Sequence, residues 1–439
     1  TAKFQGSASL FMRSNNESVG LSARLQGAGN HFYWKANGTF IDYADYKVPT
    51  GSIQYYSYDI PLHNHRLRNT AGFEHDGSMT FGYRSHNFHT ELKLSDAYSK
   101  SGFFANAHGL EVRLSDIDYD RSRRDIDLPY QSVNHLRVMS HTVYEQGSLA
   151  LEADLAYQNN HRKELSEPVS HGYMPVPPSS LEREFKKDTY TANLIARLSL
   201  GSRHTLTAGF NSEYQHNRRS GWGFIMPDFE TASFGTYAFD RFTVRKDLIL
   251  NAGVRYDHVR TSIHSYRDWF KTPVSATDSV FKERSEDLRR SFNSLTWSAG
   301  VNYSVGQWIL KANVGKSFRV PIPKELGTDG VNYHIFRYEK GNPGLNPEES
   351  YQLDAGIHWG NDRVTVQFDP YLNYFPNYIY MNPTPDYYEG LQWYYYTQSR
   401  VIRWGFELQT DWKILPSLDA ELKGEYLYAE QLSGEKKGY

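Results

Sequence analysis

Val364-Thr-Val-Gln-Phe-Asp-Pro-Tyr-Leu-Asn-Tyr374 is the stretch of sequence that decides the fold, because its side chains alternate in character. One set of alternate positions is apolar or aromatic throughout, and the other set is mainly Thr, Gln, Asp and Asn. An alternation with period two is typical of a β-strand with one apolar and one polar face. It returns at 149–157, 248–257 and 418–426. Charges recur on the polar face, which therefore contacts water, either around a soluble sandwich or inside a large barrel.

The connections between these segments favour the barrel, because short and long connections alternate along the chain. Very short turns are expected at Gly29-Asn30, His86-Asn87, Gln146-Gly147, Gly201-Ser202, Lys246-Asp247, Gly306-Gln307, Gly360-Asn361 and Pro416-Ser417. Long polar connections are expected near 43–68, 100–132, 161–187, 218–231, 260–290, 317–350 and 378–397. An up-and-down membrane barrel has short periplasmic turns at one rim and long extracellular loops at the other. A sandwich with Greek-key links has no reason to separate the two kinds so cleanly.

The composition agrees with a membrane barrel. The 439 residues include 34 Tyr, 24 Phe and 9 Trp, although the chain is polar overall, and a transmembrane barrel places such rings in girdles at both membrane interfaces. No stretch approaches about 18 consecutive apolar residues, so a helical membrane span is excluded. The 48 basic and 50 acidic residues nearly balance, which gives no electrostatic reason to expect nucleic acid as a partner. The sequence has no cysteine, and therefore no disulfide, thiolate metal site or cysteine nucleophile.

We therefore predict an all-β fold, a large antiparallel transmembrane β-barrel in which residues 1–439 form one domain surrounded by outer-membrane lipid. Strands of about 9–15 residues give roughly 17 strands, the first near 3–13. Bacterial single-chain barrels have an even number of strands, so we expect the last strands to lie outside this sequence. A barrel of about 22 strands has a plugged lumen, and we expect the N-terminal plug to lie outside it as well.

Two motifs carry a family resemblance. Phe318-Arg319-Val320-Pro321 precedes a long connection, and Asn342-Pro343-Gly344-Leu345 closes it before Asn346-Pro347-Glu348-Glu349-Ser350. They resemble the Phe-Arg-Ala-Pro and Asn-Pro-Asn-Leu boxes of TonB-dependent outer-membrane receptors, which flank one large extracellular loop. Val320 and Gly344 depart from the family pattern. Gly253-Val254-Arg255-Tyr256-Asp257 is similar to Bacteroidetes members of the family. A simpler interpretation of the boxes is that Pro and Asn-Pro only shape the loop.

The resemblance implies a function in active uptake across the outer membrane of a Gram-negative bacterium, with no covalent catalysis and no required cofactor. Energy would come from the TonB–ExbB–ExbD complex, acting through the plug. The ligand classes it implies are an iron complex (siderophore or haem) or another metal such as zinc. The alternatives are a glycan, peptide or cobalamin importer with a surface lipoprotein, or a passive porin-like barrel. No Gly-x-Ser-x-Gly elbow or His-Glu-x-x-His motif favours an enzyme.

Candidate ligand-binding residues lie in the expected loops. In the haem-receptor branch of the family a histidine between the two boxes binds haem iron, which makes His334 the candidate metal ligand. In His63-Asn64-His65 the two imidazoles would share one side of an extended segment, which suits a common metal ion. His108 lies between small and aromatic residues, and further loop histidines occur at 161, 171 and 264. Tyr387, Tyr388 and Trp393 are expected mid-loop, where rings can stack on a ligand. The simpler interpretations are solvated loop histidines and an aromatic girdle.

Overall fold

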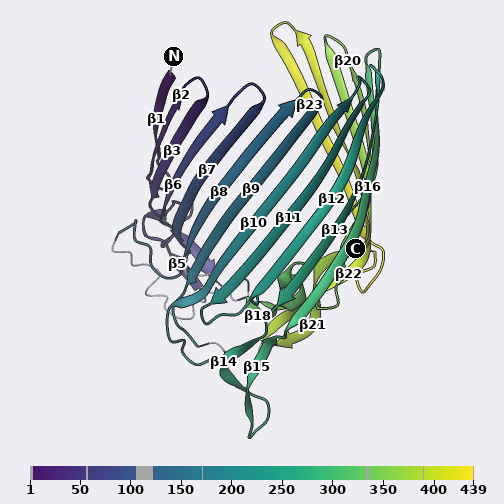
Figure 1. The fold of residues 1–439 in the computed structure, drawn as a ribbon. Helices are drawn as coiled ribbons and strands as arrows, with labels where there is room; N and C mark the ends of the chain where they lie inside the picture. Colours follow the sequence, from purple (N-terminus) through teal and green to yellow (C-terminus); the bar gives the residue numbers. More distant parts are fainter. Residues whose placement is uncertain are drawn as a thin grey trace.

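The computed structural model describes residues 3–55, 58–104, 122–170, 172–332, 335, 337–388 and 390–438. One sheet of 19 strands dominates the fold, and Figure 1 shows it curving into a barrel wall. Two of these strands, β18 and β19, belong to a loop, and the other seventeen build the wall in chain order, as the sequence predicts. Adjacent wall strands are antiparallel. In the described part of the chain, β1 pairs only with β2 and β23 only with β22.

The wall strands and their bounds are β1 (Lys3–Arg13), β2 (Ser18–Ala28), β3 (Phe32–Tyr43), β6 (Gly72–Arg84), β7 (Phe88–Gly102), β8 (Tyr130–Gln146), β9 (Leu149–Leu165), β10 (Leu181–Leu200), β11 (His204–Ser220), β12 (Phe229–Arg245), β13 (Leu248–Ile263), β16 (Leu288–Val305), β17 (Trp308–Arg319), β20 (Glu348–Gly360), β21 (Val364–Tyr388), β22 (Leu391–Leu415) and β23 (Leu418–Gln431). The connections contain the short elements β4 (Ser52–Tyr55), β5 (Tyr58–Pro61), η1 (His63–His65), β14 (Tyr266–Pro273), β15 (Ser279–Ser285), α1 (Pro323–Gly327), β18 (Asp329–Asn332) and β19 (Arg337–Lys340). None of the described helices has the length and apolar character that crossing a membrane requires.

The two rims of the wall differ. All eight predicted short turns are present and gather at one rim, the upper one in Figure 1, here called the turn rim. Gly147, Gly201 and Gly306 have positive φ angles of 59°, 59° and 58° in these turns, a conformation that glycine adopts without steric cost. The long connections gather at the opposite rim, here called the loop rim, where the β14–β15 hairpin projects furthest in Figure 1.

The wall has an apolar outward face and a more polar inward face. Leu155, Phe234 and Leu295 point outward and remain 53%, 45% and 57% exposed. Asp154 alternates with Leu155 on β9 and therefore points inward. This is the arrangement expected of a barrel whose outer surface contacts lipid and whose lumen contacts water.

The connection between the two sequence boxes folds back into the barrel mouth. Phe229, Ile263 and Phe292 lie on the inward faces of β12, β13 and β16, close to the loop rim, and are at most 5% exposed. Leu326 and Leu345 pack against these three side chains, and each is nearly inaccessible to solvent. We call residues 320–347 the inturned loop. Its apolar cluster is a small core in the mouth of the barrel, separate from the lipid-facing surface.

Three expectations about the connections are wrong. The predicted loop at 378–397 is a hairpin, because β21 continues to Tyr388 and β22 starts at Leu391. The connection predicted at 161–187 is shorter than expected, because β9 continues to Leu165 and β10 starts at Leu181, so His161 lies in a strand. His63-Asn64-His65 is not extended. It forms a 3-10 turn in which Asn64 and His65 have φ angles of 52° and 58°, so the alternation of an extended strand does not apply.

Candidate functional site

The inturned loop begins at an ion-pair network built on the first sequence box. Arg319 ends β17 and donates from Nη1 to both carboxylate oxygens of Glu325, at 2.8 and 3.0 Å. Glu325 also accepts from the backbone N–H of Ile322 at 2.9 Å, which satisfies a free donor at the start of α1. A second pair joins Arg319 to Glu348 at 3.4 Å. One guanidinium therefore fixes the short helix relative to the ends of β17 and β20.

The second box closes the loop onto the same helix. The backbone N–H of Asn342 donates to the carbonyl oxygen of Glu325 at 2.8 Å. The Asn342 side chain then accepts from the N–H of Gly344 at 2.9 Å, which makes a tight turn of the kind that Asn favours. Arg290 on β16 donates to the carbonyl oxygens of Pro343 and Leu345. Both boxes thus contact the wall and each other through the inturned loop.

A buried polar network joins the inturned loop to the β14–β15 hairpin. Arg284 donates from Nε to Asp268 at 2.7 Å, and both side chains are more than 90% buried. The Tyr338 hydroxyl accepts from Arg284 Nη1 at 3.2 Å and donates to Asp329. Burial, reinforced by the carboxylate of Asp329, raises the pKa of Tyr338 well above its ordinary value, so this phenol keeps its proton.

The ring of Tyr338 lies against the β21–β22 hairpin. Its centroid is 4.6 Å from that of Tyr388 and 5.4 Å from that of Trp393. Cations also lie near these rings, since the ammonium groups of Lys282 and Lys340 lie 4.3 Å from the Tyr388 centroid and 5.0 Å from the Trp393 centroid. β19 pairs in parallel with β22 in the same region. Desolvation and the nearby Arg284 charge lower the pKa of Lys282.

Glu339, on β19 of the inturned loop, has a fully buried carboxylate. It accepts from Asn332 at 3.0 Å and from Arg337 at 2.9 Å, and Lys324 lies 2.7 Å from its second oxygen. Burial alone would raise the pKa of the Glu339 carboxyl, but the ammonium of Lys324 and the hydrogen bonds from Asn332 and Arg337 lower it below the ordinary value. The inturned loop is therefore held by a buried carboxylate with three polar partners as well as by its apolar core.

The predicted ligand-binding residues are only partly brought together. Tyr388 and Trp393 meet around Tyr338, while Tyr387 beside them is 66% exposed. His63 and His65 are exposed in their turn, where Nδ1 of His65 lies 2.9 Å from the carbonyl oxygen of Thr50. His108, His171 and His334 lie outside the described residues. The ligand role of all these side chains remains a prediction.

The sequence matches the family model described as "TonB dependent receptor-like, beta-barrel" over residues 11–436. The chain belongs to this family. Members of the TonB-dependent receptor family are transporters rather than enzymes and work in the Gram-negative outer membrane with the TonB–ExbB–ExbD system. No curated protein matches the sequence.

Solved structures of TonB-dependent receptors share the fold. The chain superposes on the copper transporter OprC with a TM-score of 0.73 at 12% identity, covering 98% of this chain and 63% of that one. The ferric enterobactin receptor PfeA of Pseudomonas aeruginosa gives 0.68 at 13% identity, covering 97% and 61%. The Serratia marcescens hemophore receptor HasR, solved with its hemophore HasA and heme, gives 0.66 at 17%, covering 98% and 63%. This TonB-dependent receptor chain thus spans somewhat less than two thirds of these relatives.

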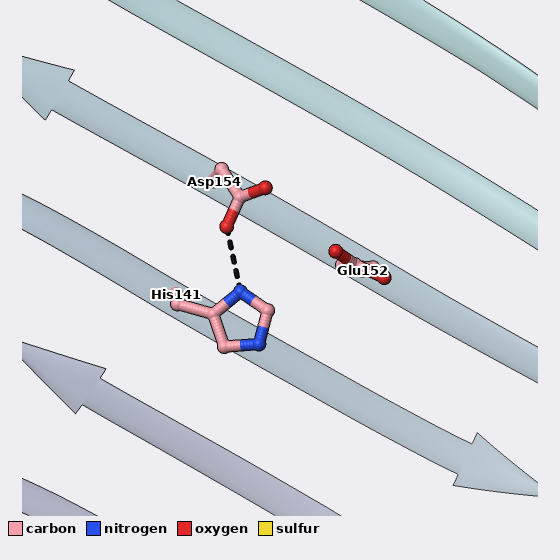
Figure 2. A group of neighbouring side chains, drawn as sticks. All are labelled: His141, Glu152 and Asp154. Carbon is pink, nitrogen blue, oxygen red and sulfur yellow. Dashed lines mark hydrogen bonds and ion pairs between the residues drawn. The ribbon is translucent and has the colours of Figure 1, made fainter. Parts of the chain in front are cut away.

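Sequence reasoning missed one histidine–carboxylate group in the receptor wall. His141 on β8 lies beside Glu152 and Asp154 on β9, and one ligand atom from each residue lies within 4.8 Å of the others (Figure 2). In the described part of the chain this is the one group of three or more such side chains with metal-ligand spacing. The histidines predicted as ligands lie in the expected loops, whereas His141 lies in a wall strand. Its signal was the short turn at Gln146-Gly147, which places His141 and Asp154 opposite each other.

Proposed function

We propose that this protein is the barrel of a TonB-dependent receptor that takes up a scarce metal nutrient across the outer membrane of a Gram-negative bacterium. The ligand is an iron complex (siderophore or haem) or another metal such as zinc. The loop rim faces the exterior and captures the ligand, and the TonB–ExbB–ExbD complex drives its passage. The similar structures named above include proteins described as a copper transporter, a ferric enterobactin receptor and a hemophore receptor, which supports this class of ligand.

The observation that carries the proposal is the surface where the inturned loop meets the β21–β22 hairpin. Lys282 and Lys340 lie over Tyr388 and Trp393, and the Arg337 guanidinium lies 4.9 Å from the ring centroid of Tyr394. An aromatic surface lined by cations suits a planar, anionic ligand, because the rings offer stacking area and the cations bind carboxylates or phenolates. Haem, a planar ring with two propionates, has this character, whereas an anionic iron–siderophore complex would meet the cations through its charge alone.

The inturned loop also argues for a receptor over a passive pore. Its apolar core and its buried charges, Glu325 and Glu339, attach it firmly to the inward face at the mouth. A loop held by a buried core and buried ion pairs is suited to presenting one binding surface. A porin would instead keep the route through its lumen open to water.

The test is growth of a deletion strain, complemented with the full-length gene, on single defined sources of iron, haem, zinc or cobalamin. We expect the deletion strain to grow poorly on one metal source. The intact gene should restore growth on that source, and the Lys340→Ala variant should fail to restore it. The matched control is Lys311→Ala, which lies on the β17 wall strand away from the inturned loop. Normal growth of the deletion strain on every metal source would reject metal uptake and favour the lipoprotein-assisted import of glycans or peptides.

The predicted role of the loop histidines in ligand binding is tested separately. In purified full-length receptor, His334→Ala, alone or combined with His63→Ala and His65→Ala, is expected to weaken haem or zinc binding at least tenfold, since each removes a neutral imidazole ligand. Spectroscopic titration with haem and calorimetry with Zn²⁺ measure the change. Affinities equal to that of the unaltered receptor would remove these imidazoles from the binding site and leave the aromatic–basic surface as the candidate.

A further inference from the structure

The wall carries a second chemical feature, far from the inturned loop, on the hairpin formed by β8 and β9. His141 and Asp154 are direct partners in the strand register, each five positions from the strand end at the turn rim. Asp154 alternates with the exposed, outward Leu155, so both members of the pair point into the lumen. Glu152 lies two residues before Asp154 and shares its face (Figure 2).

The geometry prepares His141 to be a metal ligand. Nδ1 of His141 donates a hydrogen bond of 2.6 Å to Oδ1 of Asp154. A metal ion held by Nδ1 and the Asp154 oxygen would take the place of this proton, because an imidazole and a carboxylate bind metal in their deprotonated forms. The ligand atoms of His141, Glu152 and Asp154 all lie within 4.8 Å of one another. Two atoms that each lie about 2.0–2.2 Å from one transition-metal ion are at most about 4.4 Å apart, so the three side chains are close to the spacing of a bound set.

The surrounding charge favours a cation. Glu91 on β7 is the register partner of His141 from the other side, so three carboxylates surround one imidazole. Among the described residues no lysine or arginine forms an ion pair with Glu91, Glu152 or Asp154. Tyr33 donates to Glu91 at 2.7 Å, and the ring of His89 lies 6.0 Å from that of His141, which adds neutral polar groups without neutralising the charge. A divalent ion would compensate this excess negative charge.

Other histidine–carboxylate pairs in the wall lack these features. His358 and Asp369 pair at 2.7 Å, and so do His204 and Asp240, but neither pair belongs to a group of three ligating side chains. The pair of His161 with Glu184 has Lys163 and Lys186 within 4 Å, so its charge is already balanced. The His141 group is therefore distinguished by both ligand number and charge.

We propose that His141, Glu152 and Asp154 form a binding site for one divalent first-row transition-metal ion on the lumenal wall. The site takes the hydrated ion, with water completing the coordination, and does not require the ligand captured at the loop rim. One imidazole and two carboxylates suit Zn²⁺ and its neighbours in the series better than they suit Mg²⁺, which prefers oxygen ligands and retains several waters.

The test is calorimetric titration of purified, metal-free full-length receptor with Zn²⁺. The expected result is that His141→Ala and Glu152→Gln each remove one Zn²⁺ equivalent or weaken it at least tenfold, the range seen when metal ligands or their supporting groups are lost. His135→Ala is the matched control, because His135 lies on the same face of β8, and its hydrogen bonds within the described residues go to the side-chain amides of Gln158 and Asn160. This control is expected to bind Zn²⁺ like the unaltered protein.

Anomalous scattering at the zinc edge from crystals of the full-length receptor supplies a second readout that does not depend on a variant folding. A peak between the three side chains supports the site. Unchanged Zn²⁺ stoichiometry and affinity in both variants, or zinc located elsewhere only, would overturn the proposal. Neither result depends on which nutrient supports growth, so the failure of this site and the failure of the uptake function remain distinguishable.

Discussion

Glu339 shows how single residues hold the inturned loop. Its carboxylate is completely buried, and Lys324, Arg337 and Asn332 supply its partners. Because its pKa is lowered in the folded protein, its stabilising effect is complete above the ordinary glutamate pKa of about 4.3 and is lost as the pH falls through the lower, folded value. Protonation would leave two cations beside a neutral acid in a buried position.

We therefore predict an acid-labile loop. Amide hydrogen exchange in β18 and β19, corrected for its intrinsic pH dependence, should show constant protection from pH 7 to about pH 5 and a decline below about pH 4.3. Glu339→Gln should lower the protection at pH 7 by about 2 kcal/mol, because it replaces charged hydrogen bonds by neutral ones, and should flatten the acid decline.

The control for this experiment is Glu283→Gln. Glu283 lies on β15, is 40% exposed and pairs with Arg267 only at 3.8 Å, so its loss should change little. Equal acid declines in Glu339→Gln and in the unaltered protein would assign the pH dependence to other carboxylates.

Individual contacts differ in how far the sequence could reveal them. The pairing of His141 with Asp154 follows from the predicted turn at Gln146-Gly147, because residues equally far from a hairpin turn face each other. The contact of Tyr338 with Arg284 joins residues 54 positions apart on two different loops. No periodicity or turn signal encodes such a contact, since it depends on how the loops fold over the mouth.

Among the elements, the β21–β22 hairpin departs most from its prediction. Pro383 and Pro385 lie within β21, and proline normally indicates the end of a central strand. The register shifts between Pro383 and Tyr387, which accommodates the prolines at an irregularity. β19 lies beside β22, and Tyr338 packs on the rings of Tyr388 and Trp393, so tertiary contacts extend a hairpin that local sequence argues against.

This interpretation predicts that the hairpin tip depends on Tyr338. Tyr338→Ala should open a cavity beside Tyr388 and Trp393 and lower the protection of amides at 386–395 by about 3 kcal/mol, the lower end of the cost of removing a buried aromatic ring. Hydrogen exchange with mass-spectrometric readout measures the change.

Tyr387→Ala is the matched control, because Tyr387 belongs to the same tip but is 66% exposed. Its exchange pattern should match that of the unaltered protein. Normal protection in Tyr338→Ala would show that the strands extend to the tip without help from the inturned loop.

At the scale of the whole molecule, the wall was predictable and the mouth was not. Seventeen wall strands and eight short turns follow from local signals, namely alternation and turn residues, repeated along the chain. The inturned loop depends on contacts such as the hydrogen bond from Thr328 to the carbonyl oxygen of Ile225, 103 residues away. The family boxes located this loop in the sequence but did not show that it folds inward onto Phe229, Ile263 and Phe292.

The alternation of the wall also fixes which face meets lipid, and that assignment can be tested at adjacent residues. Leu155 points outward from β9 and is 53% exposed, while Ala156 points into the lumen. An arginine on the lipid face of a barrel costs about 2–4 kcal/mol near the bilayer midplane, whereas lumenal substitutions are tolerated because water reaches them. Leu155→Arg should therefore lower the free energy of unfolding in lipid bilayers by about 2–4 kcal/mol, and Ala156→Arg by less than about 1 kcal/mol. Guanidinium titration of the full-length protein refolded in vesicles, followed by tryptophan fluorescence, measures both values. Equal costs at the two positions would mean that neither face of β9 contacts the hydrocarbon core. A larger cost at Ala156 would mean that the face carrying Ala156, and not the face carrying Leu155, meets lipid.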